Sequence, residues 1–445
     1  MSLKFSGVVV VTMLSTLPLS SHADTASLPT PVIASYSASG SAQEPSSSQF
    51  SIASALLGHP ANNDDIKRGL EQMEQSAGQG YAPALFELAN FYENGVHVKQ
   101  DVSKAANLYE QAAVQGYVDA QYNLALLQLK PPKDITKARY WFEKAAQQKD
   151  TEAQYNLALL FDTPENGIAD PLEATHWFTQ AAQNGHKDAQ FDLGVRYLKG
   201  TALPVNLSQA AYWFSRAAEQ NDPAAAFNLA LLYEDGQGIA KSLDKAIYWY
   251  RKAAQLGEAG AQYNLGIKYL MGEGVQQDHT KAIEWIRKAA DGGNPAAQYT
   301  VGYMYDQGMD FPKDDEMALY WYRQSAEQNY PDAQFALALM FSKGQGVAAD
   351  NEEAIKWFRK AADTNHAGAE FNLGTYMAHG IGTAKDLPTA AYWLSLAANQ
   401  GYEHAAANRD YVLQLLTPEE HDELTHRLET AAKTVQHQDK QASIQ

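Results

Sequence analysis

Cysteine, histidine and carboxylate side chains are the residues that most often act as nucleophiles, proton carriers or metal ligands. The chain has no cysteine, which excludes thiolate nucleophiles, thiolate metal sites and disulfides. Its twelve histidines lie at irregular positions, and His421 and His426 lack the H-E-x-x-H pattern of a zinc protease. We find no phosphate-binding loop and no nucleophile elbow. The sequence therefore predicts a protein that is not an enzyme and that has no cofactor or metal.

Aromatic and amide side chains do recur at a fixed step. The aromatic positions are Phe86, Tyr122, Tyr155, Phe191, Phe227, Tyr263, Tyr299, Phe335 and Phe371. The residue that follows is often asparagine, at Asn123, Asn156, Asn228, Asn264 and Asn372. An amide donates and accepts hydrogen bonds at once, which suits a bound peptide group. The structural alternative is that the asparagines bond to a neighbouring helix and the rings fill the space between repeats.

The tryptophans show that a repeat positions these side chains. There are eight, each 36 residues after the last: Trp141, Trp177, Trp213, Trp249, Trp285, Trp321, Trp357 and Trp393. Such regularity follows an architecture rather than one ligand, so we expect this column to lie in the structural core. A period of this length is typical of an array of helix hairpins, whose units must stack to cover their apolar faces.

One unit, from Ala261 to Ala296, is enough to predict its two helices. Apolar residues at helical spacing give the first helix, and Gly272 and Gly274 end it. Asp278 is placed to cap the second helix, which ends at Gly293. The same capping slot holds Asp101, Asp170, Asn206, Ser242, Asp314, Asp350 and Asp386. The same closing slot holds Gly80, Gly116, Gly185, Asn221, Gly257, Asn329, Asn365 and Gly401, residues that tolerate left-handed backbone, with Lys149 as the exception.

The repeats divide the chain. We expect the array over residues 48–404, with residues 48–83 as a degenerate first unit in which Gln49 mirrors Gln334. One step, between Ala120 and Ala153, is only 33 residues, and the loops at residues 163–171 and 309–315 also depart from the common form. Residues 405–433 are expected to form a helical cap, begun by a capping box at Thr417 and Glu420. Residues 434–445 are expected to be a flexible tail.

The N-terminus predicts export. Residues 1–23 have a short apolar stretch and end in Ser21-His22-Ala23, which fits a signal peptide cut after Ala23. Residues 24–47 are rich in Ser, Ala and Pro and are expected to be a disordered linker. The formal charge of the chain is −18, which argues against nucleic acid and favours a neutral or basic partner. We expect no membrane span after signal cleavage.

The unit that begins Ala261-Gln262-Tyr263-Asn264-Leu265-Gly266 resembles the Sel-one-like repeat, a 36-residue relative of the tetratricopeptide repeat, and the likeness covers about residues 84–404. It implies an all-α, right-handed superhelical solenoid of about ten helix hairpins, with the first helices on the concave face. In tetratricopeptide relatives an asparagine on that face clamps a bound peptide. By this resemblance the candidate groove residues are Asn123, Asn156, Asn228, Asn264 and Asn372, with Tyr263 and Tyr299 beside them.

The resemblance also implies adaptor roles, several of them in exported bacterial proteins. We therefore expect a non-catalytic interaction scaffold or regulator of the cell envelope, in the periplasm or secreted, that binds a protein or peptide. The alternative is a module that binds glycan or peptidoglycan fragments by stacking sugars on rings such as Tyr263 and Tyr299. Some disulfide-stapled relatives have been linked to cell-wall fragments, but this chain lacks their cysteines.

Overall fold

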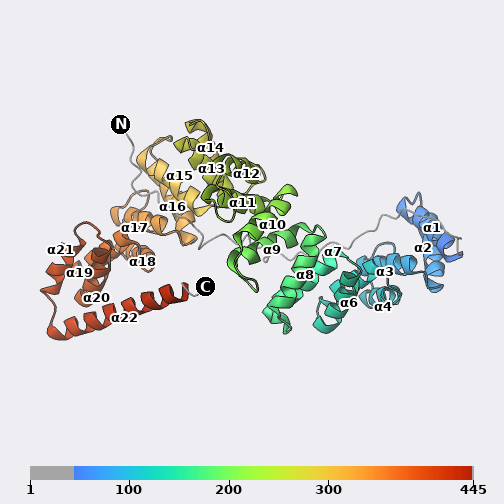
Figure 1. Cartoon of the computed structure of the whole chain (residues 1–445). Helices are drawn as coiled ribbons and strands as arrows, with labels where there is room; N and C mark the ends of the chain where they lie inside the picture. Colours follow the sequence, from blue (N-terminus) through green and yellow to red (C-terminus); the bar gives the residue numbers. More distant parts are fainter. Residues whose placement is uncertain (1–44, 443–445) are drawn as a thin grey trace. The chain divides into compact units, whose positions relative to one another are not determined.

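The computed structural model describes residues 45–442, and within that range it contains helices and no strands (Figure 1). The predicted signal peptide, residues 1–23, and the linker up to residue 44 lie outside the described residues. The first helix, α1, spans Pro45–Gly58, so the last three residues of the predicted linker are helical. Proline is favoured in the first turn of a helix, where its missing N–H costs nothing.

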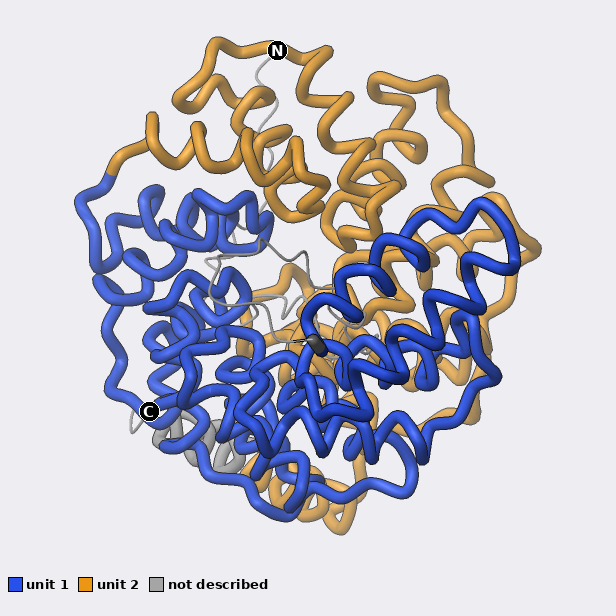
Figure 2. The backbone as a smooth tube through the Cα atoms, turned by 90° about the vertical axis from the view of Figure 1, so that its right-hand side faces the viewer, with its two compact units in different colours: residues 1–241 blue, residues 242–445 orange. Residues whose placement is uncertain are grey.

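The chain forms two compact units, residues 1–241 and 242–445 (Figure 2). In the first unit each helix packs on the next along the chain. After α1, its helices are α2 (Asn63–Gly78), α3 (Ala82–Asn94), α4 (Val102–Ala113), α5 (Val118–Gln128), α6 (Ile135–Gln147), α7 (Thr151–Asp162), the short η1 (Pro164–Asn166), α8 (Pro171–Gln183), α9 (Lys187–Lys199), α10 (Leu207–Glu219) and α11 (Pro223–Asp235).

The second unit repeats the scheme and ends in two helices of a different kind. Its helices are α12 (Leu243–Gln255), α13 (Ala259–Met271), α14 (His279–Asp291), α15 (Pro295–Gln307), α16 (Asp315–Glu327), α17 (Pro331–Lys343), α18 (Asn351–Ala362), α19 (Ala367–His379), α20 (Leu387–Asn399), α21 (Ala405–Leu413) and α22 (Pro418–Ala442). The chain is thus an all-α repeat solenoid. In each repeat the odd-numbered helix from α3 to α19 comes first, and we call these the first helices.

The predicted helix signals are confirmed. At the second helices, the side chain in the capping slot accepts a backbone N–H of the first turn, as Asp278 does from Lys281 at 3.0 Å. The others do the same: Asp101, Asp170, Asn206, Ser242, Asp314, Asp350 and Asp386. Every predicted closing residue has a positive φ, from 61° at Asn221 to 98° at Gly185. Lys149 keeps this backbone too, with φ of 69°, although it is neither Gly nor Asn.

The core of each unit lies between successive helices. The alanine that opens each repeat, from Ala84 to Ala369, has no exposed surface. Of the tryptophans, Trp141, Trp213, Trp321, Trp357 and Trp393 are buried, while Trp177, Trp249 and Trp285 are half-buried. The residue after each tryptophan lies deeper still, at 0–2% exposure: Phe142, Phe178, Phe214, Tyr250, Ile286, Tyr322, Phe358 and Leu394.

The degenerate first unit is a helix hairpin made of α1 and α2. The Gln79 side chain donates to Gln49 Oε1 at 2.7 Å, across 30 residues. Regular repeats form the same bond at the same separation, for example from Gln220 to Gln190 at 2.9 Å. The hairpin therefore keeps a defining contact of the repeat although most of its sequence pattern is lost.

The predicted C-terminal cap consists of α21 and α22. The capping box forms as expected, with Thr417 N donating to Glu420 Oε2 at 2.8 Å and Glu420 N donating to Thr417 Oγ1 at 3.3 Å. The predicted flexible tail, residues 434–445, begins within α22, which continues to Ala442. Residues 434–442 contain no glycine or proline, and their Gln, Lys and Ala favour helix.

Candidate partner-binding faces

The five asparagines of the candidate groove all donate hydrogen bonds within the protein. Asn123 and Asn228 are buried, and Asn123 contacts Asn90 and the Tyr109 hydroxyl, both at 3.4 Å. The other three are half-buried. Asn264 donates to the Tyr250 hydroxyl at 3.3 Å, Asn156 to the Glu152 carbonyl at 2.9 Å and Asn372 to the Gly368 carbonyl at 2.7 Å. A peptide clamp therefore stays a prediction for Asn156, Asn264 and Asn372, whose surfaces are accessible in part.

Tyr263 and Tyr299 lie in one tyrosine cluster of the second unit, together with Tyr303, Tyr322 and Tyr330. The Tyr299 ring lies 5.6 Å from those of Tyr322 and Tyr330 and 6.5 Å from that of Tyr303, centroid to centroid. Tyr263 reaches the cluster through its hydroxyl, 3.4 Å from the Thr300 hydroxyl on α15. Burial, with Asp332 nearby, raises the pKa of Tyr299 to about 12. The Tyr299 phenol therefore stays neutral and can donate a hydrogen bond.

The first unit instead presents an acidic row, which we define as Glu87, Asp119, Asp150, Glu152, Asp188 and Asp192. Asp119, Glu152 and Asp188 each precede a buried alanine in the first turn of α5, α7 or α9. Carboxylates are stabilised there by the helix dipole. Asp188 and Asp192 are four residues apart and so share one face of α9.

Neighbouring carboxylates in the acidic row repel one another. Burial and the charge of Asp119 raise the pKa of Glu87, and burial also raises that of Asp119. The pKa of Asp150 is raised by burial and by Asp119 and Glu152, against the opposing hydrogen bond from Ala153. The row thus carries charge that is partly desolvated and only partly neutralised.

Asp192 is the most perturbed member of the row. Burial raises its pKa to about 6, with further repulsion from Asp188 and Asp162, while a hydrogen bond with Tyr155 and the charge of Arg196 act in the opposite direction. Arg196 is itself buried and donates to Asp162 and, at 3.1 Å, to Thr175. Its guanidinium is therefore already engaged and cannot fully neutralise Asp192.

Some members of the row have a positive neighbour. A His186 ring nitrogen lies 3.4 Å from Glu152, and this hydrogen bond lowers the pKa of the carboxyl. The Lys187 ammonium lies 3.7 Å from Asp188, where both side chains are open to solvent and the pair contributes little. Among the described residues no group of three or more His, Asp or Glu is arranged to hold a metal ion.

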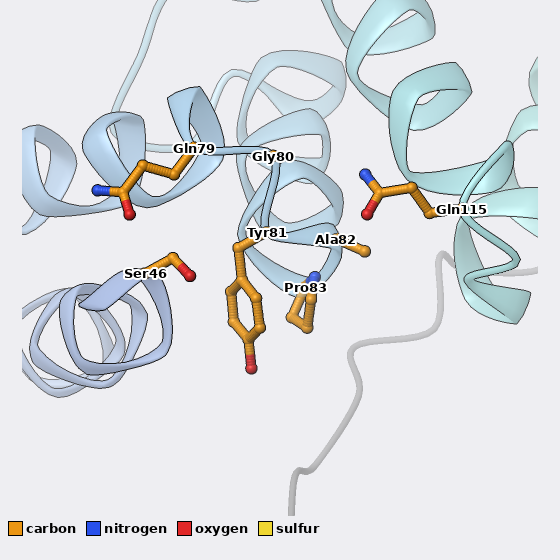
Figure 3. A pocket seen from close by; sticks show the side chains of 7 residues that line it. All are labelled: Ser46, Gln79, Gly80, Tyr81, Ala82, Pro83 and Gln115. Carbon is orange, nitrogen blue, oxygen red and sulfur yellow. The ribbon is translucent and has the colours of Figure 1, made fainter. Parts of the chain in front are cut away.

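The first unit also has a small cavity of 270 Å³ where α1 and α2 meet α3 (Figure 3). It is lined by Ser46, Gln79, Gly80, Tyr81, Ala82, Pro83 and Gln115. None of these side chains is a carboxyl, an imidazole or a cation, and the Gln79 amide is spent on Gln49. The polar side chains that line it are the hydroxyl groups of Ser46 and Tyr81 and the amides of Gln79 and Gln115.

The acidic row is not among the predicted site residues, because carboxylates were singled out in the sequence as helix caps, as at Asp278. A signal was available, since an acidic residue directly precedes the opening alanine at Asp119, Glu152, Asp188 and Asp332. The tyrosine cluster was found only in part. Tyr263 and Tyr299 belong to the aromatic column, whereas Tyr303 and Tyr330 occupy positions that are not aromatic in most other repeats.

The sequence model of the Sel1 repeat matches nine consecutive segments of the chain. They are residues 82–117, 118–150, 151–186, 187–222, 223–258, 259–294, 295–330, 331–366 and 367–402. The second segment is the short 33-residue repeat, and the hairpin of α1 and α2 precedes the first match. A comparison with curated protein sequences finds no match.

Two solved structures resemble the chain over most of its length. One is c5321, a protective antigen of uropathogenic Escherichia coli with an SLR fold, at 26% identity and a TM-score of 0.60, covering 85% of this chain and 90% of that one. The other is a Sel1 repeat protein from Oxalobacter formigenes, at 29% identity and a TM-score of 0.55, covering 70% and 90%. Proteins with this tetratricopeptide-like fold generally serve as interaction scaffolds and are generally non-catalytic. The chain belongs to the Sel1 repeat family.

Proposed function

We propose that the chain is a non-catalytic scaffold or regulator of the bacterial cell envelope, which binds a basic segment of a partner protein on its first helices. The acidic row of the first unit carries this proposal. Ionised carboxyls that are desolvated and repel one another gain most from a cation placed between them. A lysine or arginine on a partner supplies that cation, with a match in charge that also speeds association.

The length of the acidic row explains why this face suits a peptide better than free ions. The row extends along α3, α5, α7 and α9, so its carboxyls meet a partner at successive repeats rather than at one point. Half-buried Asn156 on α7 offers an amide beside Glu152, where it could bond to the partner's backbone. A linear basic segment is the simplest ligand that satisfies several repeats at once.

The export signal predicted from the sequence supports the assignment to the envelope. The evidence is the leader pattern at residues 1–23, with its apolar stretch and small residues before the expected cut. The periplasm is our first choice and secretion the second. No helix of the described residues is long and apolar enough to cross a bilayer.

The alternative function, binding of glycan or peptidoglycan fragments, would use the tyrosine cluster of the second unit. A sugar stacks on the open face of an aromatic ring, but the Tyr299 ring has three other tyrosines within 6.5 Å. Its phenol stays neutral and can donate a hydrogen bond, which supports a polar contact rather than stacking. The geometry favours the protein partner.

The acidic row is tested by neutralising three members that cap no helix. Asp119→Asn, Glu152→Gln and Asp188→Asn are combined, and the matched control combines Glu110→Gln, Glu173→Gln and Glu219→Gln, which remove the same charge from α4, α8 and α10. Calorimetry measures binding of deca-lysine and of deca-glutamate to each protein. Crosslinking in the envelope fraction then identifies the partners that each protein captures.

We expect the native and control proteins to bind deca-lysine in a salt-dependent way, with roughly tenfold weaker binding in the acidic-row variant, or about 1.4 kcal/mol. Captured partners should have basic segments and should be lost from the same variant. Equal binding by the variant and the control would reject the acidic row. Saturable binding of muropeptides by all three proteins, without a protein partner, would favour the glycan function.

A further inference from the structure

A buried glutamine joins each of six first helices to the second helix before it. Its Nε2 donates to the backbone carbonyl eight residues earlier, at 2.9–3.2 Å. The pairs are Gln121 with Ala113, Gln154 with Ala146, Gln190 with Ala182, Gln262 with Ala254, Gln298 with Ala290, and Gln334 with Ala326. At most 8% of any of these side chains is exposed. The same slot holds buried apolar residues in two other repeats, Leu85 and Ala226. Where the slot holds glutamine, the side chain therefore donates to this carbonyl.

The other end of the amide accepts a bond in four of these six repeats, whereas the Oε1 atoms of Gln262 and Gln334 are buried without a partner. The donor is a side chain at the end of the second helix of the same repeat: Gln148 to Gln121, Asn184 to Gln154, Gln220 to Gln190 and Gln328 to Gln298, at 2.8–2.9 Å. In these four repeats one group accepts with one atom and donates with the other. A neutral amide satisfies both requirements.

The ninth repeat places Glu370 in this slot, on α19. Its Oε2 accepts from Gln400 Nε2 at 2.9 Å, in the same way that Gln298 accepts from Gln328. Its Oε1 takes the place of the donating amide nitrogen. This oxygen is buried and has no hydrogen-bond partner. The side chain has no exposed surface. By the spacing of the other repeats, the waiting acceptor is the carbonyl of Ala362, at the end of α18.

We infer that Glu370 is held in its protonated form, with the proton on Oε1 donated to the Ala362 carbonyl, and that the junction of α18 and α19 is therefore a pH-sensitive joint in the array. A protonated carboxyl has one O–H donor and one free acceptor, so it matches the amide it replaces. An ionised carboxylate has acceptors only, and one of them would face a carbonyl oxygen in a buried site, at considerable cost.

The groups around Glu370 agree with this assignment. Burial raises the pKa of Glu370 to about 7, while the Gln400 bond and the charge of His366 act in the opposite direction. His366 caps α19, stacks on Phe335 and has a ring nitrogen 3.3 Å from Asp332 of α17. Against Glu370, α20 presents the neutral amide of Gln400 and α18 ends at the Ala362 carbonyl. Within residues 45–442, His366 is the group whose charge acts on this carboxyl.

The sign of the effect follows from linkage. In the unfolded chain the carboxyl ionises near its ordinary pKa of 4.5, whereas in the folded protein it does so near 7. Between these values the folded state holds a proton that the unfolded state has lost, so stability falls as the pH rises through this window. Above the folded pKa the loss is complete and stability no longer depends on this group.

The experiment compares thermal unfolding of the full chain and of Glu370→Gln between pH 5 and pH 8.5. Both proteins keep His366 and Asp332, so the difference between them isolates the effect of Glu370. We expect equal midpoints near pH 5 and a midpoint for the variant that exceeds the native one increasingly up to about pH 8. A difference that does not vary with pH overturns the inference.

The reverse substitution provides a second, independent test. Gln298→Glu introduces the carboxyl where both partners, Ala290 and Gln328, are in place. We expect this variant to lose stability as the pH rises over the same window, and hydrogen exchange, corrected for intrinsic rates, to locate the loss at α14 and α15. A uniform loss at every pH would show that the slot does not select a protonated acid, and would reject the inference.

Discussion

At the scale of the residue, buried tyrosine hydroxyls need partners and obtain them from the first helices. Tyr109 contacts Asn90 Oδ1 at 2.6 Å and Glu93 Oε2 at 2.7 Å, and Tyr250 accepts from Asn264. A buried hydroxyl without such a bond would cost about 1–3 kcal/mol. This is the structural role of part of the asparagine column, and it limits which asparagines a partner can use.

The position after each tryptophan should matter more for stability than the tryptophan itself where the latter is half-buried. Tyr250 is fully buried, so Tyr250→Ala leaves a cavity and should cost about 3–5 kcal/mol. Trp249 is only half-buried, so Trp249→Ala should cost less. Denaturant unfolding of both variants measures the two losses in the free energy of unfolding and shows which is larger. A larger loss for Trp249→Ala would show that the tryptophan is the main packing residue.

At the scale of the element, the second glycine of the four G-x-G loops (Gly238, Gly274, Gly346 and Gly382) has a role beyond the turn. Its φ is positive, as at Gly274 (68°) and Gly346 (67°), which glycine adopts without strain. It also lies against the start of the preceding second helix. A Cβ on Gly346 would come within 2.3 Å of the Asp315 carbonyl oxygen, and one on Gly238 within 2.3 Å of the Leu207 carbonyl carbon. This glycine therefore sets how closely successive repeats stack.

A pair of alanine substitutions separates this contact from the backbone requirement. Gly346→Ala meets both a positive φ and the Asp315 backbone, whereas Gly257→Ala meets a positive φ of 94° in open space. Gly257→Ala should cost about 1–2 kcal/mol, and Gly346→Ala clearly more, because a backbone atom cannot turn aside. Thermal unfolding of the two variants is the measurement. Equal costs would mean that the stacking contact is relaxed without penalty.

Most of the elements were predictable from the sequence because their signals are local and recur. Asp278 caps and Gly293 closes within a few residues of the helix they serve, and the period shows the same choice in each repeat. The acidic row depends instead on contacts such as that between Asp119 and Asp150, which join different repeats and require the orientation of each first helix. Glu370 shows the same limit, since only the bonds of the equivalent glutamines reveal what its slot requires.

At the scale of the whole molecule, the charge of −18 makes association with a basic partner depend on pH as well as on salt. The pKa of Asp192 is about 6, so this carboxyl is largely protonated at pH 5 and ionised at pH 7. Binding of a cation favours the ionised form, and protons are released when it binds.

Binding of deca-lysine should therefore tighten from pH 5 to pH 7, and the gain should shrink in Asp192→Asn. Calorimetry in two buffers of different ionisation enthalpy would report the released protons directly. The Asp235→Asn variant, changed on α11 outside the acidic row, is the matched control and should keep the native pH dependence. If Asp192→Asn also keeps the native pH dependence of binding, that dependence arises elsewhere on the acidic surface.

Within each unit, packing joins helices that are close along the chain. Stability in such an array is a sum of local terms, and the terminal repeat needs a cover. Here α22 supplies it by packing on α20 through buried Leu424, while Arg427 donates to Thr389 at 3.1 Å and lies over the Tyr392 ring.

Leu424→Asp places a charge in that contact, so hydrogen exchange should quicken in α19 and α20 and stay unchanged in α3 to α10. Thr425→Asp adds the same charge at the exposed neighbouring position and should leave both regions as they are. When each repeat is coupled only to its neighbours, a substitution in α22 affects exchange only in the adjacent helices. The extensive contact of α22 within its unit is with α20. Faster exchange that reached α3 to α10 would instead mean that the repeats of the two units unfold as one cooperative body.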